Sequence, residues 1–246
     1  MELIGRGCSA FWLLGNAPGK YGDMGGYDGR MLFLQEMARI ESGIVELDRV
    51  LGGGFVPGSV VLLGGDPGAG KSTLLLQVST ELAKQQSVLY VSGEESLQQL
   101  AMRARRLGLP LDQLQVAAET RAEAIAELIA KKPPAMLVLD SIQVMQLESI
   151  DSHPGTVTQV RETAAFFTRL AKQTGTVVVM VGHVTKDGNL AGPKVLEHMI
   201  DCFIMLEGGS ESKYRVLRGQ KNRFGAVNEL GVFGMTELGL KEVKNP

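Results

Sequence analysis

The stretch Gly65-Asp-Pro-Gly-Ala-Gly-Lys-Ser72 decides how the rest of this sequence is interpreted. The apolar run Ser59–Gly65 leads into it and predicts a strand, and residues Lys71–Ala83 have the pattern of a helix. Strand, glycine-rich turn and helix with G-x-x-x-x-G-K-[ST] spacing predict a phosphate-binding loop, or P-loop. Glycines allow backbone N–H groups to approach phosphate oxygens closely, and the helix N-terminus adds partial positive charge.

The P-loop pattern predicts ATP and Mg²⁺ as the bound cofactors. Lys71 would reach the β- and γ-phosphates, and the Ser72 hydroxyl would ligate Mg²⁺. The residues expected to bind the nucleotide are Gly65, Asp66, Pro67, Gly68, Ala69, Gly70, Lys71, Ser72 and Thr73. The alternative is a chance match in a loop that binds no nucleotide, but the flanking strand and helix argue against it.

Composition limits the class of protein further. The chain has 246 residues, of which 44% are hydrophobic, and this is ample for one buried α/β core. The formal net charge of −2 means that any nucleic acid must be bound by local basic groups. Cys8 and Cys202 form no C-x-x-C pair, so we expect no zinc site, no disulfide framework and a reducing, cytoplasmic compartment. No apolar run approaches the roughly 20 residues of a membrane span, so no membrane association is expected.

Strand and helix patterns alternate through most of the chain and predict an α/β fold with a mostly parallel central sheet flanked by helices. Helices are expected at residues 44–51, 71–83, 96–107, 121–131 and 155–172, and strands at 59–65, 87–92, 115–118, 135–140 and 176–181. In the helix at 96–107, Leu97, Leu100 and Ala101 are expected to lie on one face.

The last quarter of the chain changes character. Strand patterns at residues 202–206, 213–218, 229–233 and 239–243 follow one another with no long helix between them. They predict consecutive antiparallel strands that extend the sheet. We expect one domain over residues 31–246, preceded by a glycine-rich leader, residues 1–30, that is disordered or not native to the folded unit.

Acidic residues at the ends of two predicted strands indicate hydrolysis. Asp140 ends an apolar strand, where a carboxylate faces the ligand crevice and would bind Mg²⁺ together with Ser72. The alternative is a carboxylate that caps a turn. Glu94 and Glu95 follow another strand, and we favour Glu94, nearer the strand end, as the base that polarises the attacking water. Acidic residues at a helix N-terminus are the alternative, because the helix dipole favours them without catalysis.

Three further positions are candidate catalytic residues. His183 follows the strand at 176–181 and could contact the γ-phosphate and report hydrolysis to the next loop; an ordinary loop histidine is the alternative. In Lys221-Asn-Arg-Phe-Gly225, at a strand end, alternation puts Lys221 and Arg223 on one face and Asn222 on the other. The two cations would suit a neighbouring subunit's triphosphate, with Arg223 as an arginine finger, unless this segment is a solvated turn.

Two loops and one arginine cluster remain. Residues 146–156 and 185–194 would emerge near the phosphates, and Lys186 and Lys194 make the second loop suitable for a DNA backbone; an ordinary active-site loop is the alternative. Arg103, Arg105 and Arg106 crowd one helix end, which favours a solvated or subunit-contacting face over a DNA site.

Several motifs together resemble the RadA (also called Sms) family of bacterial, RecA-like DNA repair ATPases, over about residues 33–246. The segments that carry the resemblance are residues 51–54, 65–73, 92–104, 140–145, 182–188 and 221–225. Lys221-Asn-Arg-Phe-Gly225 is the most distinctive of them.

The resemblance implies a RecA-type core, homo-hexameric rings in the full-length form and ATP at subunit interfaces. It implies single-stranded and branched DNA as partners, a recombinase partner, and a role in recombinational repair through branch migration and helicase-like translocation. Residues 146–156 and 185–194 would be the DNA-facing loops, and Lys221 and Arg223 the trans-acting and DNA-coupling pair. The family's four-cysteine zinc finger and its Lon-protease-like domain have no counterpart in the sequence, so we expect a fragment or truncated product with an unrelated leader.

The sequence supports more than one class of function. A DNA-stimulated ATPase motor is favoured, and an ATP-switched DNA-binding scaffold or damage sensor is the alternative. A small-molecule kinase fits less well, because no acceptor-binding lid is evident beside Lys221 and Arg223.

Overall fold

The computed structural model of the chain describes residues 38–183, 196–208 and 212–243. Every described element belongs to one unit, Arg39–Pro246. The expected leader at residues 1–30 and the second candidate DNA loop at 185–194 lie outside the described residues. None of the described helices is both long and apolar enough to cross a membrane.

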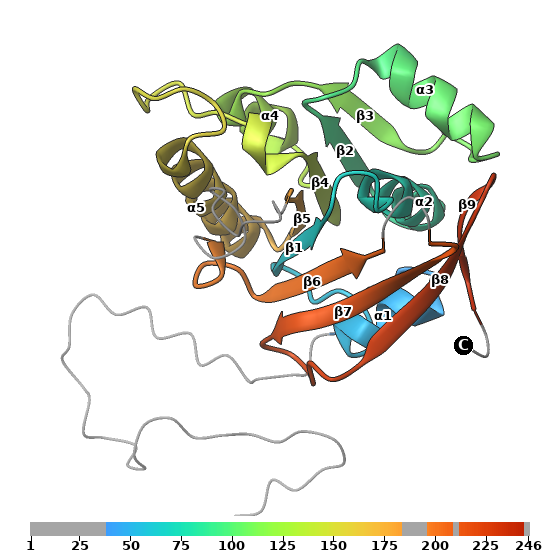
Figure 1. Cartoon of the computed structure of the whole chain (residues 1–246). Coiled ribbons are helices and arrows are strands. Elements are labelled where there is room, and N and C mark those ends of the chain that lie inside the picture. Colours follow the sequence, from blue (N-terminus) through green and yellow to red (C-terminus); the bar gives the residue numbers. More distant parts are fainter. Residues whose placement is uncertain (1–37, 184–195, 209–211, 244–246) are drawn as a thin grey trace, which may run out of the picture. The chain divides into compact units, whose positions relative to one another are not determined.

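The strands of the described residues form one sheet (Figure 1). They are β1 (Val60–Gly65), β2 (Val88–Ser92), β3 (Gln115–Ala118), β4 (Met136–Asp140), β5 (Val177–Val181), β6 (Cys202–Glu207), β7 (Tyr214–Asn222), β8 (Leu230–Thr236) and β9 (Gly239–Glu242). Their order in the sheet is β3-β2-β4-β5-β1-β6-β7-β8-β9. Strands β3 to β6 in that order are parallel, and β7, β8 and β9 continue the sheet in antiparallel fashion. The predicted fold class is confirmed.

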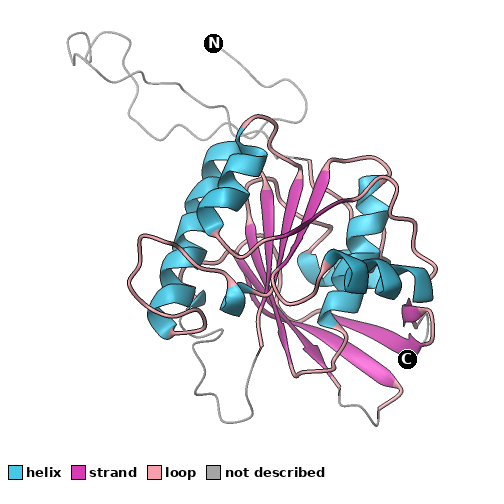
Figure 2. Cartoon of the chain, turned by 90° about the horizontal axis from the view of Figure 1, so that it is seen from above, coloured by secondary structure: helices cyan, strands magenta, loops and turns pink. Residues whose placement is uncertain are grey.

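Helices cover both faces of this sheet (Figure 2). They are α1 (Val45–Leu51), α2 (Lys71–Ala83), α3 (Leu97–Arg106), α4 (Ala122–Ala130), the short 3₁₀ helix η1 (Ile142–Val144) and α5 (Val157–Thr174). Helices α1 and α5 end at Gly52 and Gly175, whose φ angles of 80° and 75° are left-handed and favour glycine. The α-helices lie close to the bounds that the sequence predicts, whereas η1 was not predicted.

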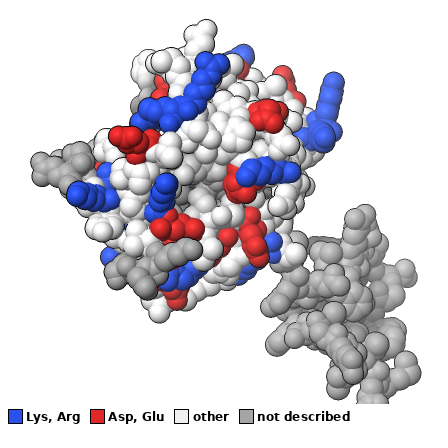
Figure 3. Space-filling model, turned by 90° about the vertical axis from the view of Figure 1, so that its right-hand side faces the viewer, with Lys and Arg blue, Asp and Glu red and all other residues white. Residues whose placement is uncertain are grey.

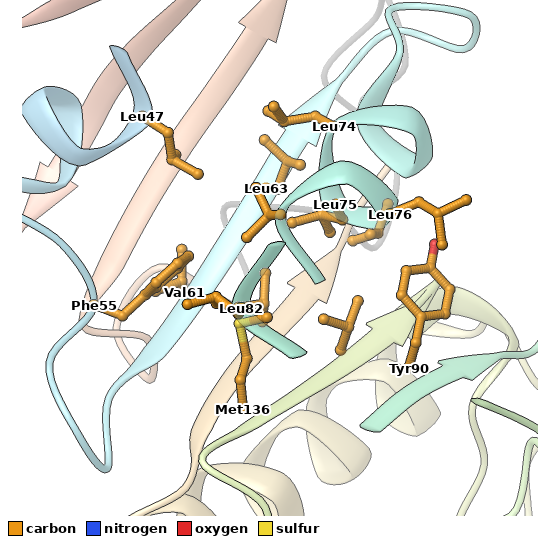
Figure 4. Close-up of a cluster of buried hydrophobic side chains, with 14 of the residues drawn as sticks. Leu47, Phe55, Val61, Leu63, Leu74, Leu75, Leu76, Leu82, Tyr90 and Met136 are labelled. Atoms are coloured by element: carbon orange, nitrogen blue, oxygen red, sulfur yellow. The ribbon is translucent and has the colours of Figure 1, made fainter. Parts of the chain in front are cut away.

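Alternation along the parallel strands separates two apolar cores. Val61 and Leu63 of β1 face the core that contains α1, α2 and α3, whereas Val60 and Leu62 face the core that contains α4 and α5. Figure 4 shows part of the first core, in which leucines of α2 pack over β1. Both faces are buried, so the parallel strands are apolar throughout and their carboxyl ends are the places where polar chemistry can be displayed.

Burial differs along the apolar face of α3. Leu97 and Leu100 lie three positions apart and so share one face of the helix, as predicted, but Leu100 and Ala104 are buried whereas Leu97 is 45% exposed. The Ser96 side chain accepts a hydrogen bond from the Gln99 amide, and the Gln99 side chain accepts one from the Ser96 amide, so this capping box starts the helix at Leu97. Leu97 is therefore the first residue of the helix and lies at the exposed end of that face.

The difference in burial between Leu100 and Leu97 predicts different effects of the same substitution at these two positions of α3. Leu100→Ala should lower the free energy of unfolding by about 2–5 kcal/mol, because it leaves a cavity in the core. Leu97→Ala, the matched control, should change it by less than about 1 kcal/mol. Urea unfolding without nucleotide measures both, and equal losses would show that the described orientation of α3 is incorrect.

Candidate nucleotide-binding site

Strands β2, β4, β5 and β1 are neighbours and run parallel, so their carboxyl ends lie side by side at the same end of the sheet. Ser92 of β2 pairs with Asp140 of β4, and the amide of Gly93 donates to the Asp140 carbonyl at 2.8 Å. On the other side, the Gly182 amide after β5 donates to the Leu63 carbonyl of β1 at 2.9 Å. The segments that leave the sheet at this carboxyl end therefore include the ones that carry Lys71, Glu94, Asp140 and His183.

The P-loop folds around its own lysine. The Lys71 side chain is only 4% exposed, and its Nζ donates to the carbonyls of Gly65 and Asp66 at 2.7 and 3.0 Å. Burial lowers the pKa of Lys71, and the nearby carboxylates, Asp140 first, oppose that shift. Gly70 precedes α2 with a φ of 104° and no side chain caps the helix, so its first amide groups remain available for an anion.

A hollow of about 290 Å³ lies over this helix N-terminus. It is lined by Gly68, Gly70, Lys71, Ser72, Thr73, Arg103, Arg106, His183 and Met235. Lys71 and the two arginines give it a positive lining, and a polyphosphate suits it in charge and in hydrogen-bonding capacity. Arg103 and Arg106, expected on a solvated or subunit-contacting face, thus belong to the surroundings of the nucleotide site.

Asp140 is held at the back of the site by a buried tyrosine. The Tyr90 hydroxyl donates to Asp140 Oδ2 at 2.5 Å, and Asp140 is 6% exposed. Burial, followed by the Asp140 charge, raises the pKa of Tyr90 above its ordinary value, so Tyr90 remains a donor at neutral pH. The second carboxylate oxygen of Asp140 makes no hydrogen bond to the described residues.

The oxygen groups present suit Mg²⁺. Ser72 and Asp140 would hold the ion, with phosphate oxygens and water as its other ligands. Among the described residues no group of three or more His, Cys, Asp or Glu side chains could hold a metal ion. That composition is typical of magnesium that arrives with a nucleotide, because such sites use one or two protein carboxylates rather than a complete protein cage.

Glu94 joins the ends of three strands. Its Oε1 accepts a hydrogen bond from the Ser141 hydroxyl and lies 3.2 Å from His183 Nε2. The hydrogen bond with His183 is the largest cause that lowers the pKa of Glu94 to about 2. Glu95 instead pairs with Arg103 at 2.6 Å, so Glu94 is the carboxylate that remains beside the hollow, ionised and oriented.

Lys221 and Arg223 lie near the amino ends of β1 and β6, whereas the P-loop follows the carboxyl end of β1. The Arg223 amide bonds the Asp201 carbonyl, and the Asp201 amide bonds the carbonyl of Val60, the first residue of β1. Arg223 also pairs with the buried Asp201 carboxylate at 3.1 Å, and Lys221 Nζ donates to the Ile200 carbonyl at 2.9 Å. The structure therefore does not bring this pair to the chain's own P-loop.

The alternation predicted for this motif is confirmed. Lys221 and Arg223 both contact the segment before β6, whereas the Asn222 side chain donates to the Leu51 carbonyl at 3.1 Å. Gly225 packs against Gly52, and a Cβ on Gly225 would lie 3.4 Å from the Gly52 Cα. The glycine-rich turn after α1 thus supports the Lys-Asn-Arg-Phe-Gly turn directly.

The first candidate DNA loop, residues 146–156, is tied to α5. Gln159 is buried, and its Nε2 donates to the carbonyls of Leu147 and Ser152 at 3.1 and 3.0 Å. Its contact with DNA stays a prediction.

The sequence did not indicate Tyr90, Ser141 or Met235 as parts of the site. Tyr90 sits at a core position of an apolar strand, and Ser141 simply follows Asp140. Their roles depend on contacts across 50 and 47 positions, to Asp140 and Glu94 respectively, and no local spacing reveals such contacts.

Comparison with known proteins shows the family of this chain. A family model described as an AAA domain matches residues 30–189. The chain belongs to this AAA domain family. It is 66% identical over 213 residues to the DNA repair protein RadA of Haemophilus influenzae and 62% identical to that of Escherichia coli, which confirms the resemblance found in the sequence. These alignments cover 87% of this chain but 46% of each relative, so the chain spans about half the length of those proteins.

A solved structure shows the same fold in a distant sequence. A KaiC-like protein from Pyrococcus horikoshii superposes with a TM-score of 0.71 at 20% identity, covering 84% of this chain and 99% of the other. At that identity the likeness supports the RecA-like P-loop architecture alone.

The contact between Glu94 and His183 predicts a measurable titration. With the pKa of Glu94 at about 2, the carboxylate stays ionised above pH 3, and the stabilisation from its lowered pKa is present above about pH 4.5 and lost as pH falls toward 2. His183→Ala should raise the pKa of Glu94 toward its ordinary 4.5, as followed by carboxyl ¹³C NMR. His153→Ala is the control, because His153 is not among the causes that shift the pKa of Glu94, and an unchanged midpoint in His183→Ala would refute the contact.

Proposed function

We propose that this domain binds and hydrolyses ATP with Mg²⁺ as the DNA-stimulated ATPase of a recombinational DNA repair protein. In the full-length, cytoplasmic protein it would process branched intermediates by branch migration and helicase-like translocation on single-stranded DNA. The observation that carries this proposal is the hollow at the N-terminus of α2, which Lys71 and His183 line. The carboxylates of Asp140 and Glu94 are near enough to Lys71 to act on its pKa, and Glu94 contacts His183. The similarity to DNA repair proteins RadA supports the choice of DNA as the effector.

Different residues of this chain would bind the phosphates, hold the metal ion and orient the attacking water. The P-loop amides and Lys71 would bind and orient the phosphates, and Ser72 and Asp140 would hold Mg²⁺, which would neutralise charge on the phosphate oxygens. Glu94 is ionised and fixed by Ser141, so it can orient a water for in-line attack. His183 shares the same carboxylate oxygen of Glu94, and a γ-phosphate contact made by His183 would alter that hydrogen bond and signal the nucleotide state to the segment that follows it.

The opposite placement of Lys221 and Arg223 supports a role in trans. Neither can serve its own triphosphate, but a neighbour in a homo-hexamer could receive both. In the isolated chain Arg223 is paired with Asp201, which also accepts from Lys172 at 2.6 Å and from the Val60 amide at 2.9 Å. Asp201 would therefore remain paired with Lys172 when Arg223 moves to a phosphate, and the arginine can be released without leaving a buried charge alone.

DNA would act through local basic groups. Figure 3 shows basic and acidic side chains interspersed on one face of the described unit, with no large field of a single sign there. We assign DNA contact to residues 146–156 and 185–194, of which the second set lies outside the described residues. A recombinase partner belongs to the same proposal.

The alternative function is an ATP-switched DNA-binding scaffold. The pairing of Arg223 with Asp201 favours it for a chain that is not assembled, because hydrolysis would then lack the charge that an arginine finger supplies. Such a protein would bind DNA in its ATP state and hydrolyse slowly.

Single-stranded DNA should raise the rate of ATP turnover, measured as phosphate release from the wild-type chain with and without oligonucleotide. Glu94→Gln should lower turnover by roughly 100-fold or more while MgATP still binds, because it removes the base and leaves the P-loop intact. In a motor this variant also loses DNA processing. If Glu94→Gln keeps its DNA function with ATP bound, the scaffold is correct and the motor is not.

Mixing two inactive variants tests the action in trans. Lys71→Ala lacks a working P-loop but keeps Arg223, and Arg223→Ala has the reverse defect. Mixed assemblies should regain ATP turnover, because one subunit supplies the arginine and its neighbour the P-loop.

The controls separate assembly from chemistry. The double variant Lys71→Ala/Arg223→Ala should not rescue Arg223→Ala, and Arg218→Ala, a half-exposed arginine on β7 that pairs with Glu207, should be active alone. Failure of the mixture in assemblies shown to contain both variants would contradict a trans role for Arg223.

A further inference from the structure

Arg215 is a buried cation in the part of β7 that lies next to the P-loop. Its side chain comes from the first antiparallel strand and is only 3% exposed. Arginine is rarely buried to this extent unless its donors are used, so its partners indicate its purpose.

The partners of Arg215 are backbone carbonyls. Its Nε donates to the Ala69 carbonyl in the P-loop at 2.9 Å. One terminal nitrogen donates to the carbonyls of Ser212 and Tyr214 at 2.6 and 3.0 Å. The planar guanidinium is therefore held by its own strand on one side and holds a P-loop peptide on the other.

The peptide that Arg215 holds joins Ala69 to Gly70. A peptide unit is planar and trans, so its C=O and N–H groups point in opposite directions. With the Ala69 carbonyl directed at Arg215, the Gly70 N–H is directed away from Arg215. Gly70 lines the nucleotide hollow, and its N–H donates to no other described residue.

This peptide needs an external restraint. Gly70 has a φ of 104°, a region that glycine enters freely, and glycine also allows the peptide before it to rotate at little cost. The amide of Ala69 bonds the Asp66 carbonyl at 3.1 Å, but that contact fixes the preceding peptide and not this one. Among the described residues, Arg215 supplies the hydrogen bond that fixes the Ala69 carbonyl.

We propose that Arg215 is a positioning residue for phosphate binding, which acts by aiming the Gly70 amide at the phosphate chain of the nucleotide. This role rests on the proposed binding of nucleotide at the P-loop. Arg215 itself touches the far side of the loop, so it acts through the peptide. The fork geometry matters as well as the charge, because Nε–H and the terminal N–H bond two different segments at once.

The test compares two substitutions of Arg215 with a control on the same strand. Arg215→Lys keeps the charge and loses the fork, and Arg215→Met loses both. Both should bind MgADP about tenfold or more weakly than wild type, measured with a fluorescent ADP analogue. The reason is that the Gly70 amide would no longer be oriented to donate a hydrogen bond to a phosphate oxygen. Arg218→Lys, half-exposed and 3.4 Å from Glu207, should bind as wild type does. Wild-type affinity in a folded Arg215→Lys would overturn the proposal.

A second measurement reads the Gly70 amide directly, and its first part uses the wild-type chain alone. In ¹⁵N-glycine-labelled wild type, MgADP should shift the Gly70 resonance strongly downfield, as a new hydrogen bond to phosphate requires. In Arg215→Lys at saturating MgADP that shift should shrink, a change that a merely structural role would not produce. A Gly70 resonance unmoved by MgADP in wild type that binds it would overturn the positioning role alone. Absence of MgADP binding in wild type would overturn the proposed function and this role together.

Discussion

The parallel direction of four neighbouring strands is the constraint on which the rest of this domain depends. Because β2, β4, β5 and β1 are adjacent and parallel, the segments that follow them leave the sheet at one end, the carboxyl end of these strands. Glu94, Asp140, His183 and the P-loop all lie at that end, although they are spread over more than a hundred residues of sequence. Hydrogen bonds between the strand ends, such as that from Gly93 to Asp140, then fix the distances between them.

Antiparallel strand β7 connects the two ends of the parallel strands. It begins beside the P-loop, where Arg215 donates to the Ala69 carbonyl, and it ends near the amino ends of β1 and β6, where the Lys221 and Asn222 side chains donate to backbone carbonyls. Under the proposed function, one strand thus supports the chain's own phosphate loop and presents cations to a neighbour's nucleotide. Nucleotide binding would then be a property of each chain, and rapid hydrolysis a property of the assembly.

Local sequence patterns predicted the elements well, because periodicity and glycine signals act over a few residues. The P-loop spacing, Asp140 at its strand end and the alternation across Asn222 are in the described structure as expected. Leu97 and Leu100 share one face of α3 as their spacing predicts, but Leu97 is exposed at the start of the helix, and spacing alone does not show where burial along a face ends. The support of Asp140 by Tyr90 and of Ala69 by Arg215 could not be predicted, because the second contact spans 146 positions and follows only from strand order.

Calorimetric titration with MgADP shows whether the P-loop builds a nucleotide site. We expect saturable binding with one nucleotide per folded chain, abolished in Lys71→Ala and retained in Glu94→Gln. Binding that survives Lys71→Ala at wild-type strength would show that the P-loop does not form the site, and the absence of any saturable binding to the wild-type chain would refute the site altogether.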